Sequence, residues 1–196
     1  MSGFQRYKKI LDLFSEERSS WTVIEISKSL KTPSSTIYRI VREMVTAEFL
    51  ESASGSYFRL GPAFIKFNRI INFSDPLVRA GQPFLKKLAN ENPITSVNVL
   101  ARLYGNNVMC VADYKSPSFK KNTSYQRGKL MPLIYGATSR AIIMQITGKR
   151  LENLINLENF KSDEDKTNFL KELKNDRKKG YCFTEGQVDK GLIGFA

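Results

Sequence analysis

The sequence predicts an α+β protein in two parts, a winged helix-turn-helix at the N-terminus and a second domain with an antiparallel sheet. Residues 22–46 contain two short patterns of helical period separated by a tight turn, and a glycine-containing hairpin pattern follows them. Beyond residue 75, strand-like runs come first, helical patterns lie between them, and strand-like runs return. This succession is typical of an α+β domain.

Three helices are predicted in the first part. Apolar residues at helical spacing predict the first helix over 4–14. Thr22 and Glu25 have the spacing of a capping box and begin the second helix, which runs through Leu30. Pro33 fits the first turn of a helix, so the third helix is predicted to begin there with Thr32 as its N-cap. Two helices joined by so short a turn predict a helix-turn-helix.

The third helix has two contrasting faces. Its apolar stripe follows the spacing of a buried face and consists of Ile37, Ile40, Val41, Met44 and Val45. The opposite face carries Ser35, Tyr38, Arg39 and Arg42, with no carboxylate before Glu43. Hydroxyl, phenol and guanidinium groups near a helix N-terminus suit DNA phosphates and the edges of guanine in a major groove. The alternative interpretation is an ordinary solvated helix face.

A hairpin follows the third helix. Residues 49–52 and 57–60 are predicted strands around a glycine-containing turn at 53–56. Such a hairpin forms a wing beside the recognition helix, where Ser54, Ser56 and Arg59 are candidates for contacts with phosphates or a minor groove. Any hairpin tip needs glycine and serine, which is the alternative explanation of these residues. An amphipathic helix then ends near Ser74, with an apolar stripe of Ala63, Phe64, Phe67, Ile70 and Ile71.

The second part alternates strands and helices. An amphipathic helix from about Leu77 ends before Asn92 and Pro93, and Ser162 with Asp165 caps a later helix that ends at Gly180. Another helix is predicted from about Ala137 to Ile146. The predicted strands cover residues 96–103, 108–114, 119–126, 181–185 and 192–196.

Composition excludes several classes of function. The chain has 31 Lys and Arg against 19 Asp and Glu, a net charge of +12 that favours a polyanionic partner. It has no histidine, which removes the commonest general base and the commonest zinc ligand, so we expect neither an enzyme nor a metal or cofactor site. Cys110 and Cys182 are predicted to be buried small hydrophobes. No run approaches the ~20 apolar residues of a membrane span, so a cytoplasmic protein is expected.

The order of these parts and the strings PSSTIYRIV and YFRLGPA resemble the IclR (isocitrate lyase regulator) family of transcription factors. The resemblance implies a DNA-binding domain over 1–61, a linker helix over 62–75 that helps to pair two subunits, and a GAF-like effector-binding domain over 76–196. The DNA contacts expected from the residues and the resemblance together are Thr22, Ser34, Ser35, Thr36, Tyr38, Arg39, Arg42, Ser54, Ser56 and Arg59.

The resemblance also implies a site for a small organic acid or aromatic effector. Its residues would be Met131, Ala137, Thr138, Thr184, Gln187 and Gly194. Free N–H groups at a helix that opens near Ala137 would suit a carboxylate. Alternatively, Ala137 and Gly194 are small because helix and sheet pack closely there. The chain departs from the family's pattern at Ser34, where a base is usual, and at Gln187, where a glutamate is usual.

Together these features predict a sequence-specific transcriptional regulator that binds a palindromic DNA operator as a dimer or a dimer of dimers. The alternative is a ligand-sensing or scaffold protein whose winged helix mediates protein contacts without reading DNA. The family normally continues beyond the position of Ala196, so the second domain is expected to be incomplete and to bind small molecules weakly or not at all.

Overall fold

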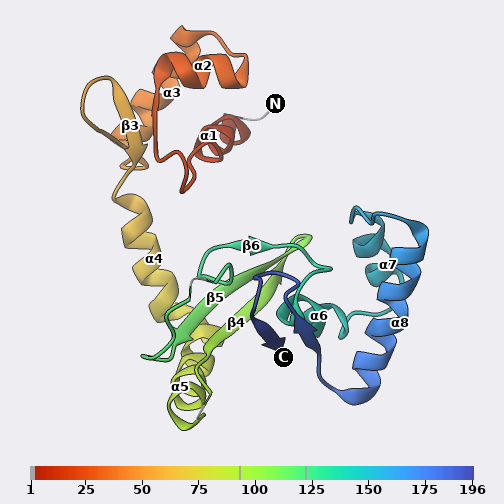
Figure 1. Cartoon of the computed structure of the whole chain (residues 1–196). Coiled ribbons are helices and arrows are strands. Elements are labelled where there is room, and N and C mark those ends of the chain that lie inside the picture. The colour runs from red at the N-terminus through yellow and green to blue at the C-terminus, as the bar shows by residue number, and fades with distance from the viewer. Residues whose placement is uncertain (1–2, 93, 122) are drawn as a thin grey trace. The chain divides into compact units, whose positions relative to one another are not determined.

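The computed structural model describes residues 3–92, 94–121 and 123–196, and the chain divides into two compact units (Figure 1). Unit 1 is Met1–Asp75 and unit 2 is Pro76–Ala196. Pro93 and Asn122, which fall at a predicted helix end and in a predicted strand, lie outside the described residues. No helix in the described part of the chain is long and apolar enough to cross a membrane.

Unit 1 is a winged helix-turn-helix, as predicted. Its elements in order are α1 Gly3–Leu11, β1 Ser20–Thr22, α2 Val23–Leu30, α3 Ser34–Thr46, β2 Leu50–Ser52, β3 Tyr57–Leu60 and α4 Ala63–Ser74. The strands form an antiparallel sheet in the order β1-β3-β2, in which Glu51 lies opposite Arg59. The strand β1 was not predicted. The first helix ends at Leu11 rather than Phe14, and the carbonyl of Leu13 instead accepts a hydrogen bond from the Trp21 indole at 3.0 Å.

The capping box predicted for α2 is confirmed, but the cap predicted for α3 is wrong. The Thr22 hydroxyl accepts the Glu25 N–H, and the Glu25 carboxylate accepts the Thr22 N–H. In α3 the N-cap position belongs to Pro33, which has no side-chain cap. The Thr32 hydroxyl instead donates to the carbonyl of Leu30 at 3.0 Å, because α2 ends through a left-handed residue, Lys31 with φ 49°.

The core of unit 1 lies between the three helices and the wing. The predicted stripe of α3 is buried at all its positions except Val45, which is half-buried. The buried cluster consists of Ile10, Ile26, Ile37, Ile40, Val41, Met44 and Leu50. Full burial of one such side chain contributes about 1.5–3 kcal/mol, so this cluster fixes α3 firmly against α1 and α2. The polar face of α3 is thereby turned to solvent.

Unit 2 has two antiparallel sheets and four helices among its described residues. Its elements are α5 Pro76–Glu91, β4 Val97–Tyr104, β5 Asn107–Lys115, β6 Leu130–Met131, α6 Ala137–Ile143, α7 Gly148–Asn156, α8 Asp163–Lys179, β7 Phe183–Glu185 and β8 Ile193–Phe195. The strands are ordered β4-β5-β6 in one sheet and β7-β8 in the other. Helix α5 packs on the larger sheet through Val78 and Leu85 against Val111 and Ala112 (Figure 1).

Three predictions for unit 2 need correction. The strand predicted over 119–126 is wrong for its described residues, 119–121 and 123–126, which form a loop, while β6 pairs with β5. The helix predicted to run to Ile146 ends at Ile143, and α7 was not predicted. The cap of α8 is confirmed, since the Ser162 hydroxyl accepts the Asp165 N–H at 3.1 Å and Gly180 follows with φ 78°.

The core of unit 2 contains both cysteines, as predicted. Cys110 and Cys182 are fully buried as free thiols, and burial raises the pKa of each to about 11. They are therefore protonated and unreactive at neutral pH. The principal cluster joins the larger sheet to α6, α7 and α8 through residues that include Val108, Leu133, Ile143 and Leu173.

Candidate nucleic-acid interface and effector site

The outer face of α3 presents most of the predicted DNA contacts together. Ser34, Ser35, Tyr38, Arg39 and Arg42 are exposed, and the Tyr38 side chain is 54% exposed. These residues occupy successive turns of one helix whose opposite side is buried in the core. The fold thus holds a hydroxyl-rich N-terminal turn, a phenol and two guanidinium groups on one rigid surface.

The two arginines are not neutralised by neighbouring carboxylates. In the described part of the chain, neither Arg39 nor Arg42 forms an ion pair. The Arg42 guanidinium lies 6.0 Å from the centre of the Tyr38 ring, within the range of a cation–π contact. Glu43, the one carboxylate of this helix, accepts a hydrogen bond from the Tyr7 hydroxyl of α1. Both cations are therefore available to an anionic partner.

The wing residues differ from one another. Ser54 and Ser56 are exposed in the turn between β2 and β3, around Gly55 with φ 68°. Arg59 is also exposed, but its Nε lies 2.6 Å from Glu51 Oε1 across the hairpin. This surface ion pair is weak, of the order of 0–1 kcal/mol, so a DNA phosphate could replace Glu51 as the partner of Arg59 with little loss of free energy.

Two of the predicted contact residues already serve the fold, and a third is half-buried. The Thr22 hydroxyl belongs to the capping box of α2 and is half-buried. The Ser34 hydroxyl donates to the Ser27 hydroxyl at 3.0 Å, and Thr36 is half-buried. The structure therefore does not bring Thr22 and Thr36 to the exposed face with the arginines, although they lie near it in sequence.

Two basic residues near this surface were missed by the sequence analysis. Arg6 and Lys9 of α1 line a cavity of about 340 Å³ together with Thr32, Pro33 and Thr36 at the first turn of α3. Cations beside a helix N-terminus favour an anion, so a DNA phosphate near this turn would meet both. The sequence does show two basic residues between the apolar positions of α1. Only the fold shows that they lie beside the N-terminus of α3.

Three of the six predicted effector residues, Ala137, Thr184 and Gly194, pack together at the start of α6. Thr184 of β7 lies opposite Gly194 of β8, and both Thr184 and Ala137 are buried. A side chain at Gly194 would bring its Cβ to 2.8 Å from Thr184 Oγ1 and to 3.1 Å from Ala137 Cβ. Glycine at this position is therefore needed for the close approach of β8 to α6. Met131 belongs to the same buried cluster as Ala137.

Side chains also cover the N-terminus of α6. The Gly136 N–H donates to Gln187 Oε1 at 3.2 Å, while Gln187 itself is exposed. The Tyr125 hydroxyl lies 3.3 Å from Ser139 Oγ and 3.3 Å from the Tyr135 carbonyl. Burial of this phenol raises the pKa of Tyr125, so the group remains a neutral hydrogen-bond donor at physiological pH.

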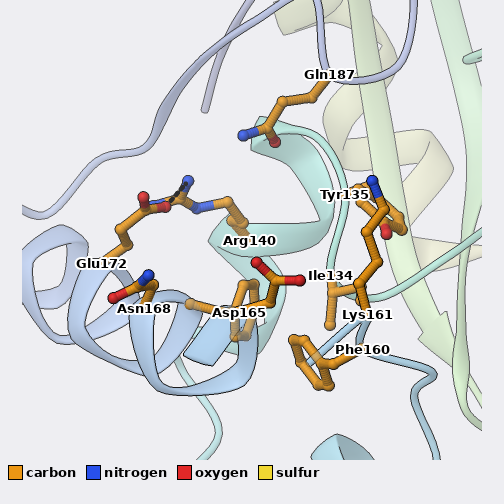
Figure 2. A pocket seen from close by; sticks show the side chains of 10 residues that line it. Ile134, Tyr135, Arg140, Phe160, Lys161, Asp165, Asn168, Glu172 and Gln187 are labelled. Atoms are coloured by element: carbon orange, nitrogen blue, oxygen red, sulfur yellow. Dashed lines mark hydrogen bonds and ion pairs between the residues drawn. The ribbon is translucent and has the colours of Figure 1, made fainter. Parts of the chain in front are cut away.

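A cavity of about 440 Å³ lies nearby, beside α6 and α8 (Figure 2). Of the six predicted effector residues, only Gln187 lines it. Figure 2 shows Gln187, Lys161 and Asp165 arranged around the opening, with Phe160 at its wall. Sequence reasoning missed this cavity because its walls come from three separate segments within residues 134–187.

Arg140 forms the wall of this cavity on α6. Its side chain is only 6% exposed, and its guanidinium pairs with Asp176 and, at 2.9 Å, with Glu172. Asp176 is 9% exposed at its side chain, whereas Glu172 is 58% exposed. The arginine is therefore held as a structural ion pair between α6 and α8 rather than as a free cation.

Comparison with known families agrees with the winged helix-turn-helix. Residues 5–54 match the model of the IclR helix-turn-helix domain. No curated protein matches the sequence of the chain. The match covers α2, the turn and α3. Both exposed arginines, Arg39 and Arg42, lie in α3.

Solved structures resemble the chain along its whole length. An IclR homolog from Microbacterium hydrocarbonoxydans, in complex with 4-hydroxybenzoate, is 20% identical with a TM-score of 0.80, over 100% of this chain and 82% of that one. An IclR transcriptional regulator from Alicyclobacillus acidocaldarius is 18% identical with a TM-score of 0.77, over 97% and 77%. An IclR family transcriptional regulator from Brucella abortus is 14% identical with a TM-score of 0.74, over 100% and 75%.

The similar proteins are named as transcriptional regulators. At these identities the structures establish the fold of the chain. Residues 5–54 therefore match the IclR helix-turn-helix domain in sequence, and the chain as a whole has the fold of the solved IclR structures.

Proposed function

We propose that this protein binds double-stranded DNA in a sequence-specific manner and regulates transcription. The observation that carries the proposal is the pair of exposed arginines on α3, Arg39 and Arg42, with no ion-pair partner among the described residues. Helix α3 enters the major groove, and the wing with Ser54, Ser56 and Arg59 lies along the adjacent backbone. The other exposed residues predicted on α3, Ser34, Ser35 and Tyr38, orient the helix through phosphates.

We further propose that the protein binds DNA as a dimer paired through α4. The apolar stripe of this helix remains open in the chain, with Phe67 45%, Ile70 51% and Ile71 50% exposed. Exposed apolar side chains that gather on one helix face are a common mark of an interface between subunits. A twofold dimer reads a palindromic operator with recognition helices about 34 Å apart.

Selection of bound sequences from randomised duplexes tests this function directly. We expect a palindrome whose half-sites lie about one helical turn apart, or a multiple of that distance. An enrichment without symmetry would contradict the dimeric arrangement. A protein that retains no duplex even at low salt would contradict DNA binding and favour the scaffold alternative.

The two arginines are expected to act differently on the selected duplex. If Arg39 reads a base edge, Arg39→Ala should cost about 1–3 kcal/mol and relax preference at one base pair. If Arg42 binds phosphate, Arg42→Ala should weaken all sequences alike and reduce the salt slope by about one. The measurement is fluorescence anisotropy over a salt series with operator and scrambled duplexes. Arg79→Ala in unit 2, an exposed arginine, is the control for lost charge alone. Identical changes for both variants would refute the assignment of roles.

We propose that small acids bind weakly, or not at all, at the predicted effector residues of this chain. The support is the packing at α6, where Gln187 accepts the Gly136 N–H and Thr184 closes on Gly194. One N–H at this helix end is thus occupied by a side chain of the protein itself, and the space at Gly194 is filled by Thr184 and Ala137.

A thermal unfolding assay with 4-hydroxybenzoate tests this expectation. A ligand at a hundred times its Kd would add about 2.7 kcal/mol, a rise of roughly 5 °C or more in Tm for a unit of this size. We expect no such rise for the unaltered chain. The variant Gln187→Ala removes the acceptor of the Gly136 N–H. It therefore tests whether this hydrogen bond is what prevents the acid from binding. A clear rise with the unaltered chain would show that the loop opens for a ligand.

A further inference from the structure

The recognition helix contains a carboxylate in a place that should weaken DNA binding. Glu43 stands one turn beyond Arg39 and directly after Arg42 on α3. Residues four apart on a helix surface are neighbours, so a free Glu43 would pair with Arg39. A carboxylate at this position would also repel the phosphates of an approaching duplex. What the Glu43 side chain contacts therefore decides how much of the positive charge on α3 is available.

In the structure this carboxylate is bonded to a neighbouring helix and forms no ion pair with Arg39 or Arg42 among the described residues. Glu43 Oε2 accepts a hydrogen bond from the Tyr7 hydroxyl, which belongs to the neighbouring helix α1. Glu43 lies on the border between two surfaces: an apolar groove with Phe4, Tyr7 and Leu11 on one side, and the polar surface with Arg39 and Arg42 on the other. The hydrogen bond ties its charge to α1 at this border, close enough to Arg39 for that arginine to act on the Tyr7 phenol.

Tyr7 is suited to hold Glu43 permanently. Its ring is half-buried against the core of unit 1, next to the fully buried Ile10, so the phenol has a fixed position on α1. The hydrogen bond to Glu43 raises the pKa of Tyr7 above its ordinary value of 10.0. The phenol therefore remains protonated, and remains a donor, throughout the physiological pH range.

We infer that Tyr7 is a positioning residue for DNA binding, which retains the Glu43 carboxylate at α1 and so keeps Arg39 and Arg42 free for phosphates and bases. This inference rests on the proposed function of α3. Tyr7 itself touches no DNA in this arrangement. Its hydroxyl acts through Glu43, and the effect is electrostatic.

The test compares Tyr7→Phe, Glu43→Gln and the double variant with the unaltered protein in duplex binding over a salt series. Tyr7→Phe keeps the ring and removes only the donor, so the released carboxylate pairs with Arg39 or repels the duplex. We expect affinity to fall about three- to tenfold and the salt slope to lose about one, as when one cation ceases to bind phosphate. Adding Glu43→Gln to Tyr7→Phe should restore both quantities, because the released group is then neutral.

Controls separate this electrostatic role from a structural one. Tyr181→Phe, at an exposed tyrosine of unit 2, should leave affinity and salt slope unchanged. A loss of affinity in Tyr7→Phe that Glu43→Gln does not restore would overturn the inference, since damage to the fold is not cured by neutralising Glu43. Equal affinities for Tyr7→Phe and the unaltered protein would overturn it as well.

A second readout needs no DNA and distinguishes failure of the contact from failure of the proposed function. Titration of carbon-13-labelled tyrosine by NMR should show the pKa of Tyr7 falling towards 10.0 in Glu43→Gln, because its anionic acceptor is lost. An unchanged pKa would refute the contact even in a protein that binds DNA. A lowered pKa in a protein that binds no duplex would confirm the contact but overturn both the positioning role and the proposed function.

Discussion

Replacing Asp176 by alanine is expected to destabilise unit 2 by about 3–5 kcal/mol, because the substitution leaves the Arg140 guanidinium buried without its principal partner. The Arg140 side chain is 6% exposed and that of Asp176 is 9% exposed, so water cannot replace the lost carboxylate. A cost of this size is a large fraction of the stability of a small domain. The measurement is urea unfolding followed by far-ultraviolet circular dichroism.

Two controls make this prediction specific. Glu172→Ala removes the other partner of Arg140, but the Glu172 side chain is 58% exposed, so a loss below about 1 kcal/mol is expected. Trp21, the single tryptophan, lies in unit 1, and its fluorescence reports whether that unit unfolds at an unchanged urea concentration. Similar losses for the two variants would show that the Asp176 pair is not the buried support of α6 and α8.

Replacing Phe67 by glutamate is expected to produce monomers with poor affinity for a palindromic operator. The side chain is 45% exposed on α4 and lies beside Ile70 and Ile71, so a charge there would be buried without a partner in the proposed dimer. A monomer loses the second half-site, and operator affinity should fall towards that for non-specific DNA, by about a hundredfold or more. Sedimentation equilibrium measures the first effect and anisotropy the second.

The matched control is Ile65→Glu, which introduces the same charge on the opposite side of α4. Ile65 is 74% exposed, and the helical spacing directs it away from Phe67 and Ile71. We expect this variant to stay dimeric. Monomers from Ile65→Glu and dimers from Phe67→Glu would move the interface to the other face of the helix. Because Phe67 also lies 6.0 Å from the Phe49 ring, the Trp21 transition should be checked for loss of stability.

The elements that the sequence predicts well are those stabilised by local interactions. The buried stripe of α3 follows from residue spacing alone, and the caps of α2 and α8 each join residues three apart in the chain. The cap of α3 fails for a local reason that patterns do not show, since the Thr32 hydroxyl satisfies the Leu30 carbonyl of the preceding helix. Helix α7 was not predicted. It begins at Gly148, with φ 61°, and glycine is a residue that usually interrupts helices.

The candidate sites divide in the same way. The exposed face of α3 was predictable because one helix carries it, and its partner Tyr7 was not, because the contact with Glu43 joins residues 36 apart. The cavity beside Gln187 draws its walls from three distant segments and has no local signature. Packing at Gly194 was foreseen only as an alternative, since close approach between a strand and a helix is invisible in residue spacing.

A distant carboxylate helps to hold the loop that replaces the predicted strand, through residues 123 and 124. Asp189 accepts hydrogen bonds from the Thr123 hydroxyl, the Ser124 hydroxyl and, at 2.8 Å across 65 positions of sequence, the Ser124 N–H. During synthesis from the N-terminus, this loop emerges from the ribosome several seconds before its anchor, at roughly 5–20 residues per second. Throughout that interval Thr123 and Ser124 lack the carboxylate that accepts their hydrogen bonds in the folded unit. This part of unit 2 therefore completes its native contacts only after synthesis has passed residue 189.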